Sequence, residues 1–101
     1  TIRDKNKLAL SSRNILLNKN NLKKAGKIAK NLIFFKKKLL KKNNLKDLIF
    51  KKKKELKKKY DIKIEYLELR KSKDLRLTKT IKNAKIFISY YINEVRLIDN
   101  F

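Results

Sequence analysis

The chain has 101 residues, of which 31 are Lys or Arg and 9 are Asp or Glu, so its formal net charge is +22. This length allows one domain with a modest core, because so short a chain buries only about 60–65% of its unfolded surface. With no Cys, no His, no Pro and a single Gly, the sequence excludes disulfides, thiolate or imidazole chemistry and a Gly-rich phosphate loop. Its apolar runs are too short to predict a membrane span.

The positive charge comes mainly from lysine, since 26 Lys accompany only 5 Arg. A charge of this size is typical of proteins that bind nucleic acid or anionic membranes. Phosphate recognition, however, usually relies on Arg, whose planar fork pairs with oxyanions. Lys, Asn and Ile are all abundant here and share A/T-rich codons rather than a physical task. Biased codon usage is therefore favoured over a dedicated polyanion-binding surface.

Residues 1–14 have no sustained periodicity and are expected to form an extended segment and a polar loop. The loop holds Leu10-Ser11-Ser12-Arg13-Asn14, which sets two hydroxyls beside a guanidinium just before a helix. Hydroxyls, exposed N–H groups and a guanidinium together form a good clamp for phosphate oxygens. An ordinary turn and helix cap fits the same residues.

Two helices are expected next. The first should begin at the N-cap Asn18, with Leu17 as a hydrophobic staple, and run to about Lys42. Its expected apolar face consists of Leu22, Ala25, Ala29, Leu32, Ile33 and Leu40. The second should begin near Asn44, with a thinner stripe of Leu45, Leu48, Ile49, Leu56 and Tyr60. The lysines on the opposite faces are interpreted as solvated.

After the second helix the apolar period changes to the two-residue alternation of a strand. Ile62, Ile64 and Tyr66 are expected on its buried face. Glu65 and Glu68 should then point to opposite faces, which excludes a close carboxylate pair. Both are interpreted as solvent-side charges that balance nearby lysines.

A hairpin is expected at the end of the chain. Ala84–Ile92 is rich in Ile, Phe and Tyr and predicts a well-buried strand, preceded by a shorter one at residues 75–77. Asn93 and Glu94 should form a tight turn, with residues 95–98 as the returning strand.

The remaining candidates for chemistry favour structural interpretations. Asp99 and Asn100 end the last strand, where a turn or cap role is expected. Tyrosines in strands are more often core than base-stacking groups, so we expect core positions for the four present. Helices followed by strands indicate the α+β class, with two main helices packed on a small antiparallel sheet in one domain, residues 1–101.

Three stretches of this sequence carry a resemblance to a known family. They are Arg3 with Leu8-Ala9-Leu10-Ser11-Ser12-Arg13-Asn14 and Leu17; Tyr66-Leu67-Glu68-Leu69; and Val95-Arg96-Leu97-Ile98-Asp99-Asn100. In order and spacing they resemble the C-terminal domain of the pantoate–β-alanine ligase (pantothenate synthetase) family. The first and last stretches are specific, the middle one is generic, and residues 19–59 match only in length and apolar spacing.

The resemblance implies a ligase of the nucleotidyltransferase superfamily that acts in two steps. Pantoate attacks ATP to give pantoyl adenylate and pyrophosphate, and the amine of β-alanine then displaces AMP. The resemblance also implies a cytoplasmic enzyme whose Rossmann-like N-terminal catalytic domain is absent from this chain and would form any homodimer. Because the chain begins at Thr1 without Met, we expect a fragment. The resemblance implies that this fragment is a C-terminal lid over ATP, inactive alone because the family's signature histidines belong to the N-terminal domain and this chain has no His.

The same resemblance assigns site residues. Ser11, Ser12 and Arg13 match the family's phosphate-gripping loop, Leu10 lies beside the nucleotide, and Ile2 falls where a backbone group meets the adenine. Arg13 is expected to be catalytic, stabilising charge on the leaving pyrophosphate. Mg²⁺ would share that work, with no metal ligand assigned in this chain.

The sequence departs from the family at some positions, and alternatives stay open. Asn6 and Lys7 stand where the family usually has Asp-Gly, and losing the Gly is expected to stiffen or reshape the loop. Asn93 replaces a Gly of the final hairpin, a milder change because Asn accepts left-handed φ. The alternatives are a small Lys-rich nucleic-acid-binding module and an inactive remnant of the ligase.

Overall fold

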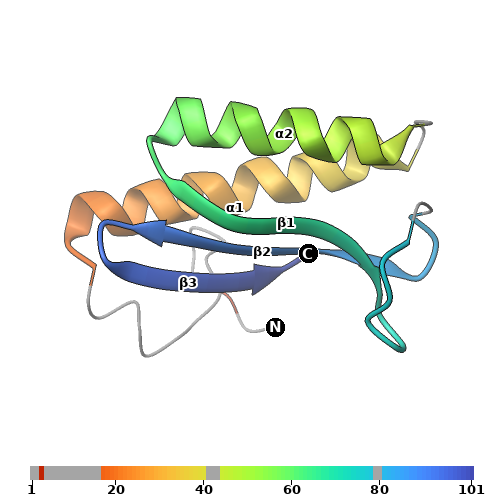
Figure 1. The fold of residues 1–101 in the computed structure, drawn as a ribbon. Coiled ribbons are helices and arrows are strands. Elements are labelled where there is room, and N and C mark those ends of the chain that lie inside the picture. The colour runs from red at the N-terminus through yellow and green to blue at the C-terminus, as the bar shows by residue number, and fades with distance from the viewer. Residues whose placement is uncertain (1–2, 4–16, 41–43, 79–80) are drawn as a thin grey trace.

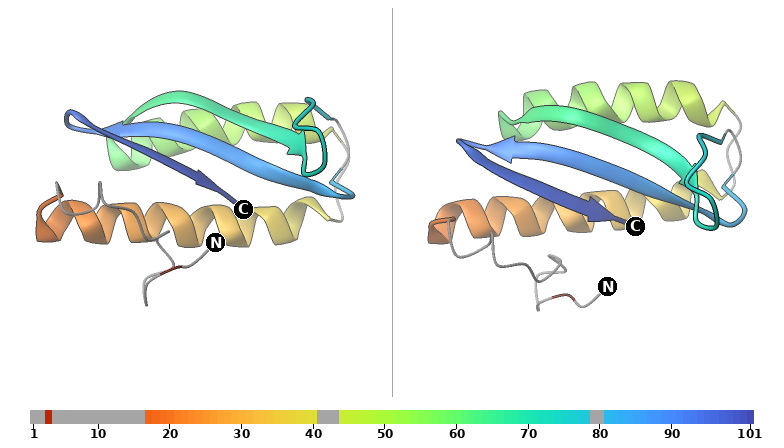
Figure 2. Two further views of the ribbon diagram at one scale, coloured as in Figure 1. Left: turned by 90° about the horizontal axis from the view of Figure 1, so that it is seen from below. Right: turned by 60° about the horizontal axis from the view of Figure 1, so that its bottom comes forward.

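Two helices and a three-stranded antiparallel sheet form two layers, with both helices on one face of the sheet (Figures 1 and 2). The computed structural model describes residues 3, 17–40, 44–78 and 81–101. Along the chain the elements are α1 (Lys19–Leu39), α2 (Leu45–Tyr60), β1 (Lys63–Lys71), β2 (Ala84–Ile92) and β3 (Val95–Asn100), and the sheet order is β1-β2-β3. The predicted α+β class is confirmed.

Helix α1 begins as its sequence predicts. The side-chain oxygen of Asn18 accepts a hydrogen bond of 2.8 Å from the Asn21 N–H, which satisfies one of the free donors of the first turn. Leu17, just before the cap, is buried. The helix ends at Leu39, and residues 41–43, which the prediction included in part, lie outside the described chain.

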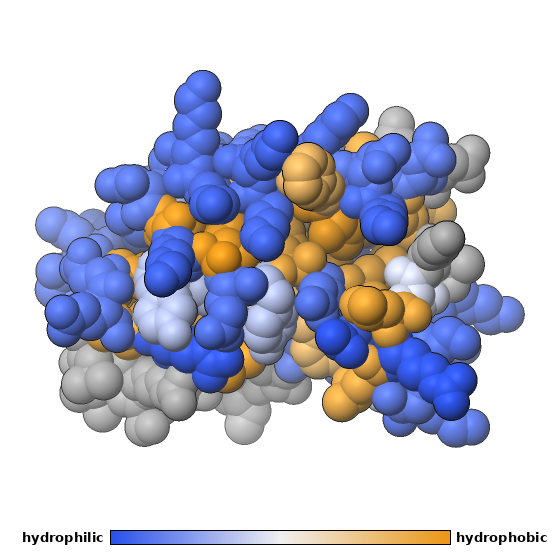
Figure 3. Space-filling model, in the orientation of Figure 1, coloured by the Kyte–Doolittle hydropathy of each residue, from blue (hydrophilic) through white to orange (hydrophobic). Residues whose placement is uncertain are grey.

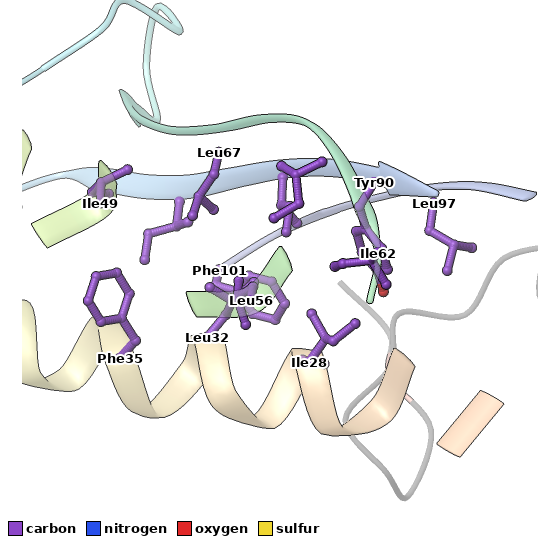
Figure 4. Packing of buried hydrophobic residues seen from close by; sticks show 14 of the residues in the cluster. Ile28, Leu32, Phe35, Ile49, Leu56, Ile62, Leu67, Tyr90, Leu97 and Phe101 are labelled. Atoms are coloured by element: carbon purple, nitrogen blue, oxygen red, sulfur yellow. The ribbon is translucent and has the colours of Figure 1, made fainter. Parts of the chain in front are cut away.

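The face that α1 buries differs from the predicted one near its C-terminal end. Ile28, Leu32, Phe35 and Leu39 follow one another at helical spacing and are buried. Figure 4 shows the first three pointing from α1 toward the sheet. Leu40, predicted on the apolar face, is 64% exposed, because it lies about a third of a turn away from this line of residues.

Helix α2 confirms the predicted stripe, with Leu45, Ile49 and Leu56 buried. Asn44, just before it, has the left-handed φ of 56°, a conformation that Asn tolerates better than most residues. Hydrophilic side chains cover most of α2 on its outer side in Figure 3. The lysine-rich face of α2 is thus turned to solvent.

The register of β1 shifts by one residue where it pairs with β2, between Ile64 and Tyr66. Glu65 is the extra residue of this bulge, which moves the following side chains to the opposite face. Leu67 and Leu69, rather than Tyr66, therefore face the core. The predicted alternation holds up to Ile64 and is wrong at Tyr66.

The predicted hairpin is confirmed. Ile92 pairs with Val95 across a two-residue turn, and Asn93 has a left-handed φ of 55°. Such a turn favours Asn or Gly because both accept positive φ at low cost. The returning strand β3 continues through Asn100, two residues beyond its predicted end.

Residues 75–77 do not form the predicted strand. Leu77 makes an isolated β-bridge with Arg70, and the Thr78 N–H donates to the Leu69 carbonyl at 3.1 Å. Leu75 has a left-handed φ of 60°, which ends any extended run. The segment instead covers the open edge of β1 near its C-terminal end, where unpaired backbone groups would otherwise be exposed.

The core lies between the helices and the inner face of the sheet (Figure 4). Phe101 belongs to it and extends the β2–β3 pairing, because its N–H and C=O exchange hydrogen bonds of 2.9 and 2.8 Å with Ile86. In the described ranges neither helix is long and apolar enough to cross a bilayer.

Candidate functional site

The residues predicted to contact a nucleotide, Ile2, Leu10, Ser11, Ser12 and Arg13, all lie outside the described residues. The structure therefore leaves their predicted roles untested. It does describe Arg3, the first residue of the opening motif, and its surroundings define the candidate site.

Arg3 binds the last three residues of the chain. Its guanidinium donates to both carboxylate oxygens of Asp99, with Nη1–Oδ2 and Nη2–Oδ1 distances of 2.8 and 3.0 Å. Nη2 also donates to the Asn100 carbonyl at 2.7 Å. The guanidinium carbon lies 4.4 Å from the centre of the Phe101 ring, within the range of a cation–π contact. Arg3 thus joins the opening and closing motifs of the sequence.

Asp99 owes its position to the alternation of β3. It pairs with Ile88 and lies on the same face as Leu97, so its carboxylate is drawn into the buried side of the sheet. Its side chain is only 7% exposed. A buried carboxylate needs a cation and hydrogen-bond donors to offset its lost hydration, and Arg3 supplies both.

The main role of Asp99 is therefore the buried ion pair with Arg3 and not the predicted turn or cap. The local bond exists, since Oδ1 also accepts from the Asn100 N–H at 2.7 Å, but the ion pair with Arg3 dominates. The sequence could have predicted this burial, because Asp99 lies two residues after Leu97 in the strand and therefore on the same, core-facing side.

Tyr90 is a core tyrosine beside this site. Burial raises the pKa of its phenol well above the ordinary value, and the nearby Asp99 carboxylate raises that pKa further. Tyr90 therefore stays neutral. The predicted core role is confirmed for Tyr90, which is 2% exposed, whereas Tyr60, Tyr66 and Tyr91 are half-buried.

A groove of about 320 Å³ opens next to Arg3, between α1 and the end of the chain. Its lining combines apolar groups with cations and consists of Arg3, Ile33, Lys36, Lys37, Leu40 and Phe101. Burial lowers the pKa of Lys36, and Lys85 nearby lowers it further. The groove suits the edge of an anionic molecule, and its described lining residues include no carboxylate for acid–base chemistry.

The second ion-pair group lies on the outer face of the sheet. Glu65 accepts hydrogen bonds from Ser89 Oγ at 3.0 Å and from Arg96 Nη2 at 2.6 Å. The Arg96 hydrogen bond, then that of Ser89, lowers the pKa of Glu65. The bulge directs Glu65 to the same face as Glu68, so the predicted opposite faces are wrong. Each carboxylate pairs with arginine rather than lysine, Glu68 with Arg70 at 2.6 Å.

A metal centre is not found in the described part of the chain, where no three His, Cys, Asp or Glu residues gather. The described carboxylates that form ion pairs are held by cations.

The family model described as "Pantoate-beta-alanine ligase" matches residues 1–101. The pantothenate synthetase of Ruthia magnifica subsp. Calyptogena magnifica is 36% identical over 100 residues, and that of Azobacteroides pseudotrichonymphae is 39% identical over 105 residues. The alignments cover 98% and 99% of this chain but 35% and 36% of those relatives. The chain thus spans about a third of their length.

The fold is also similar to a solved structure. The crystal structure of pantothenate synthetase from Thermus thermophilus has a TM-score of 0.82, with 24% sequence identity, and the match covers 100% of this chain and 37% of that protein. At this identity the likeness concerns the fold alone. These similarities agree with the ligase resemblance and give no support to the nucleic-acid-binding alternative.

Proposed function

The chain belongs to the pantoate-beta-alanine ligase family, and on that premise we propose that it forms the C-terminal, ATP-covering domain of a pantothenate synthetase. The observation that carries this proposal is the family match over residues 1–101, at the C-terminal third of relatives that are otherwise much longer. The other two thirds of such an enzyme are proposed to form a Rossmann-like N-terminal catalytic domain, which would make any homodimer contact, and the whole enzyme is proposed to be cytoplasmic.

The proposed reaction has two steps. A carboxylate oxygen of pantoate attacks the α-phosphorus of ATP, the bond to pyrophosphate breaks, and pantoyl adenylate forms. The amine of β-alanine then attacks the acyl carbon, and AMP leaves as the amide bond of pantothenate forms. Negative charge develops on the departing phosphates in the first step, so a fixed cation there accelerates the reaction.

The residues proposed for that work are those of the opening motif. Arg13 is proposed to stabilise the pyrophosphate charge, and Ser11 and Ser12 to donate hydrogen bonds to phosphate oxygens. Leu10 and Ile2 are proposed to lie against the nucleotide. ATP is proposed as the substrate, and Mg²⁺ is proposed to share the stabilisation of charge at the phosphates.

A reconstitution experiment tests the proposal. The 101-residue chain would be joined to the N-terminal two thirds of the Ruthia magnifica relative, and AMP and pantothenate release would be measured with pantoate, β-alanine and ATP. We expect release from the joined protein and none from either part alone. Absence of AMP from a joined protein that is folded by circular dichroism would contradict the proposal and favour an inactive remnant.

A further inference from the structure

We propose that Arg3 is a positioning residue for ATP binding, which acts by fixing the opening motif to the last strand of the sheet. This inference rests on the proposed function. It concerns a residue that need not touch the nucleotide, and its support is the contact set of Arg3 with Asp99, Asn100 and Phe101.

The anchor on the sheet side is rigid. Asp99 is held in register opposite Ile88, and Phe101 exchanges two backbone hydrogen bonds with Ile86. Ile86 and Ile88 are both 0% exposed. A side chain bound to residues 99–101 is therefore bound to the centre of the fold rather than to a loose end.

The Arg3 side chain makes several contacts that together hold it firmly against residues 99–101. Its fork makes two parallel bonds to one carboxylate, which fixes its direction as well as its distance. The bond to the Asn100 carbonyl adds a third hydrogen bond, and the cation–π contact with the Phe101 ring adds a fourth interaction. The Arg3 side chain is 17% exposed, so solvent competes little for these contacts.

Arg3 stands between residues that are proposed to contact the nucleotide, so fixing Arg3 is expected to affect ATP binding. Ile2 directly precedes it, and Leu10 follows seven positions later, so the proposed nucleotide contacts stand on both sides of the anchor. A fixed residue within such a segment limits the conformations open to its neighbours. It thereby lowers the entropy that ATP binding must remove, which raises the fraction of molecules ready to bind.

Other arginine pairs of the described chain do not share this placement. Arg70 binds Glu68 within one strand, Arg76 binds Asp74 within one loop, and Arg96 binds Glu65 across the sheet. Arg96 is the best matched control, because its pair also joins distant parts of the chain and yet lies within the sheet itself.

The test uses the joined protein described above, as wild type and with Arg3→Ala, Arg3→Lys or Arg96→Ala. Losing an anchor that acts equally before and during the reaction raises KM without changing kcat. For Arg3→Ala we expect the KM for ATP to rise about tenfold, with kcat and the KM for β-alanine within about twofold. Arg3→Lys, which keeps the charge but not the fork, should fall between Arg3→Ala and wild type. Arg96→Ala should leave the KM for ATP unchanged.

Three outcomes decide the matter. A selective rise in the KM for ATP supports the inference, and Asp99→Asn should reproduce it if Arg3→Ala fails to fold. An unchanged KM for ATP in a folded Arg3→Ala protein overturns the positioning role and leaves the proposed function standing. A wild-type joined protein that is folded but forms no AMP overturns the proposed function, and this inference with it.

Discussion

The Arg3 guanidinium and the Asp99 carboxylate form a paired hydrogen bond across 96 positions of the sequence. These two residues belong to the two most specific motifs of the chain, at its opposite ends. Arg3 meets the closing motif because β3 runs back along β2, and the last residues of β3 lie at the edge that Arg3 reaches. Arg3 of the opening motif is therefore bound directly to the end of the closing motif.

Removing the carboxylate should cost stability. Asp99→Ala leaves the largely buried guanidinium of Arg3 without its ion-pair partner, and breaking one side of such a pair typically costs about 3 kcal/mol. Urea unfolding of the chain would measure the loss. Asp74→Ala is the matched control, because its ion pair with Arg76 is exposed and should contribute less than about 1 kcal/mol. Equal losses in the two variants would contradict the assigned burial of Asp99.

Two leucines of the first helix region test the observed packing face. Leu32 is 0% exposed, so Leu32→Ala should lower the free energy of unfolding by about 3 kcal/mol through lost burial and a residual cavity. Leu40 is 64% exposed, and Leu40→Ala should change it by no more than about 0.5 kcal/mol. Thermal unfolding of both variants would check this, and a large loss for Leu40→Ala would restore the face predicted from sequence.

Glu65 predicts a pH dependence on the acid side. Its folded-state pKa is lowered, so between that value and the unfolded value of about 4.5 the unfolded chain binds more protons. The stabilisation is present above about pH 4.5 and is lost as the pH falls through the folded-state pKa. In Glu65→Gln the free energy of unfolding should therefore fall less steeply with acid than in wild type. Parallel pH curves for the two proteins would refute this.

Arg13 carries the prediction for catalysis. In the joined protein, Arg13→Ala should cost about 2–4 kcal/mol of transition-state stabilisation, the usual cost of losing one fixed charge-stabilising group. This corresponds to a loss of about 30- to 1,000-fold in kcat/KM. Arg76→Ala, which removes a highly exposed Arg from a loop, is the control and should leave the rate unchanged. A full rate in Arg13→Ala would mean that this loop does not hold the phosphates.

Local patterns predicted most of the secondary structure correctly. The Asn18 cap, the stripe of α2, the β2 strand and the Asn93 turn each depend on residues close together in the chain. Capping, helical spacing and left-handed φ are short-range effects, so neighbouring residues suffice to predict them. The ligase resemblance likewise came from the motifs at the two ends.

The predictions that were wrong concern residues whose placement depends on contacts with distant segments of the chain. The bulge at Glu65 arises from pairing with β2, and neither strand's own alternation reveals it. Leu40 and Leu39 are equally apolar, and only the packing of α1 against the rest of the fold decides which of them is buried. Residues 75–77 are apolar enough for a strand, but they pair with β1 at a single bridge.

The net charge of +22 is a property of the sequence alone, whereas the partner of each charged side chain depends on the tertiary structure. The sequence alone determined the composition, the family resemblance and the order of helices and strands, since these depend on residue types and short spacings. Only the tertiary structure decided that Asp99 is a buried partner of Arg3, because a buried carboxylate must find its cation in space and not along the chain. That pairing links the charge of one arginine to the segment proposed to hold ATP, while the lysine-rich face of α2 remains turned to solvent.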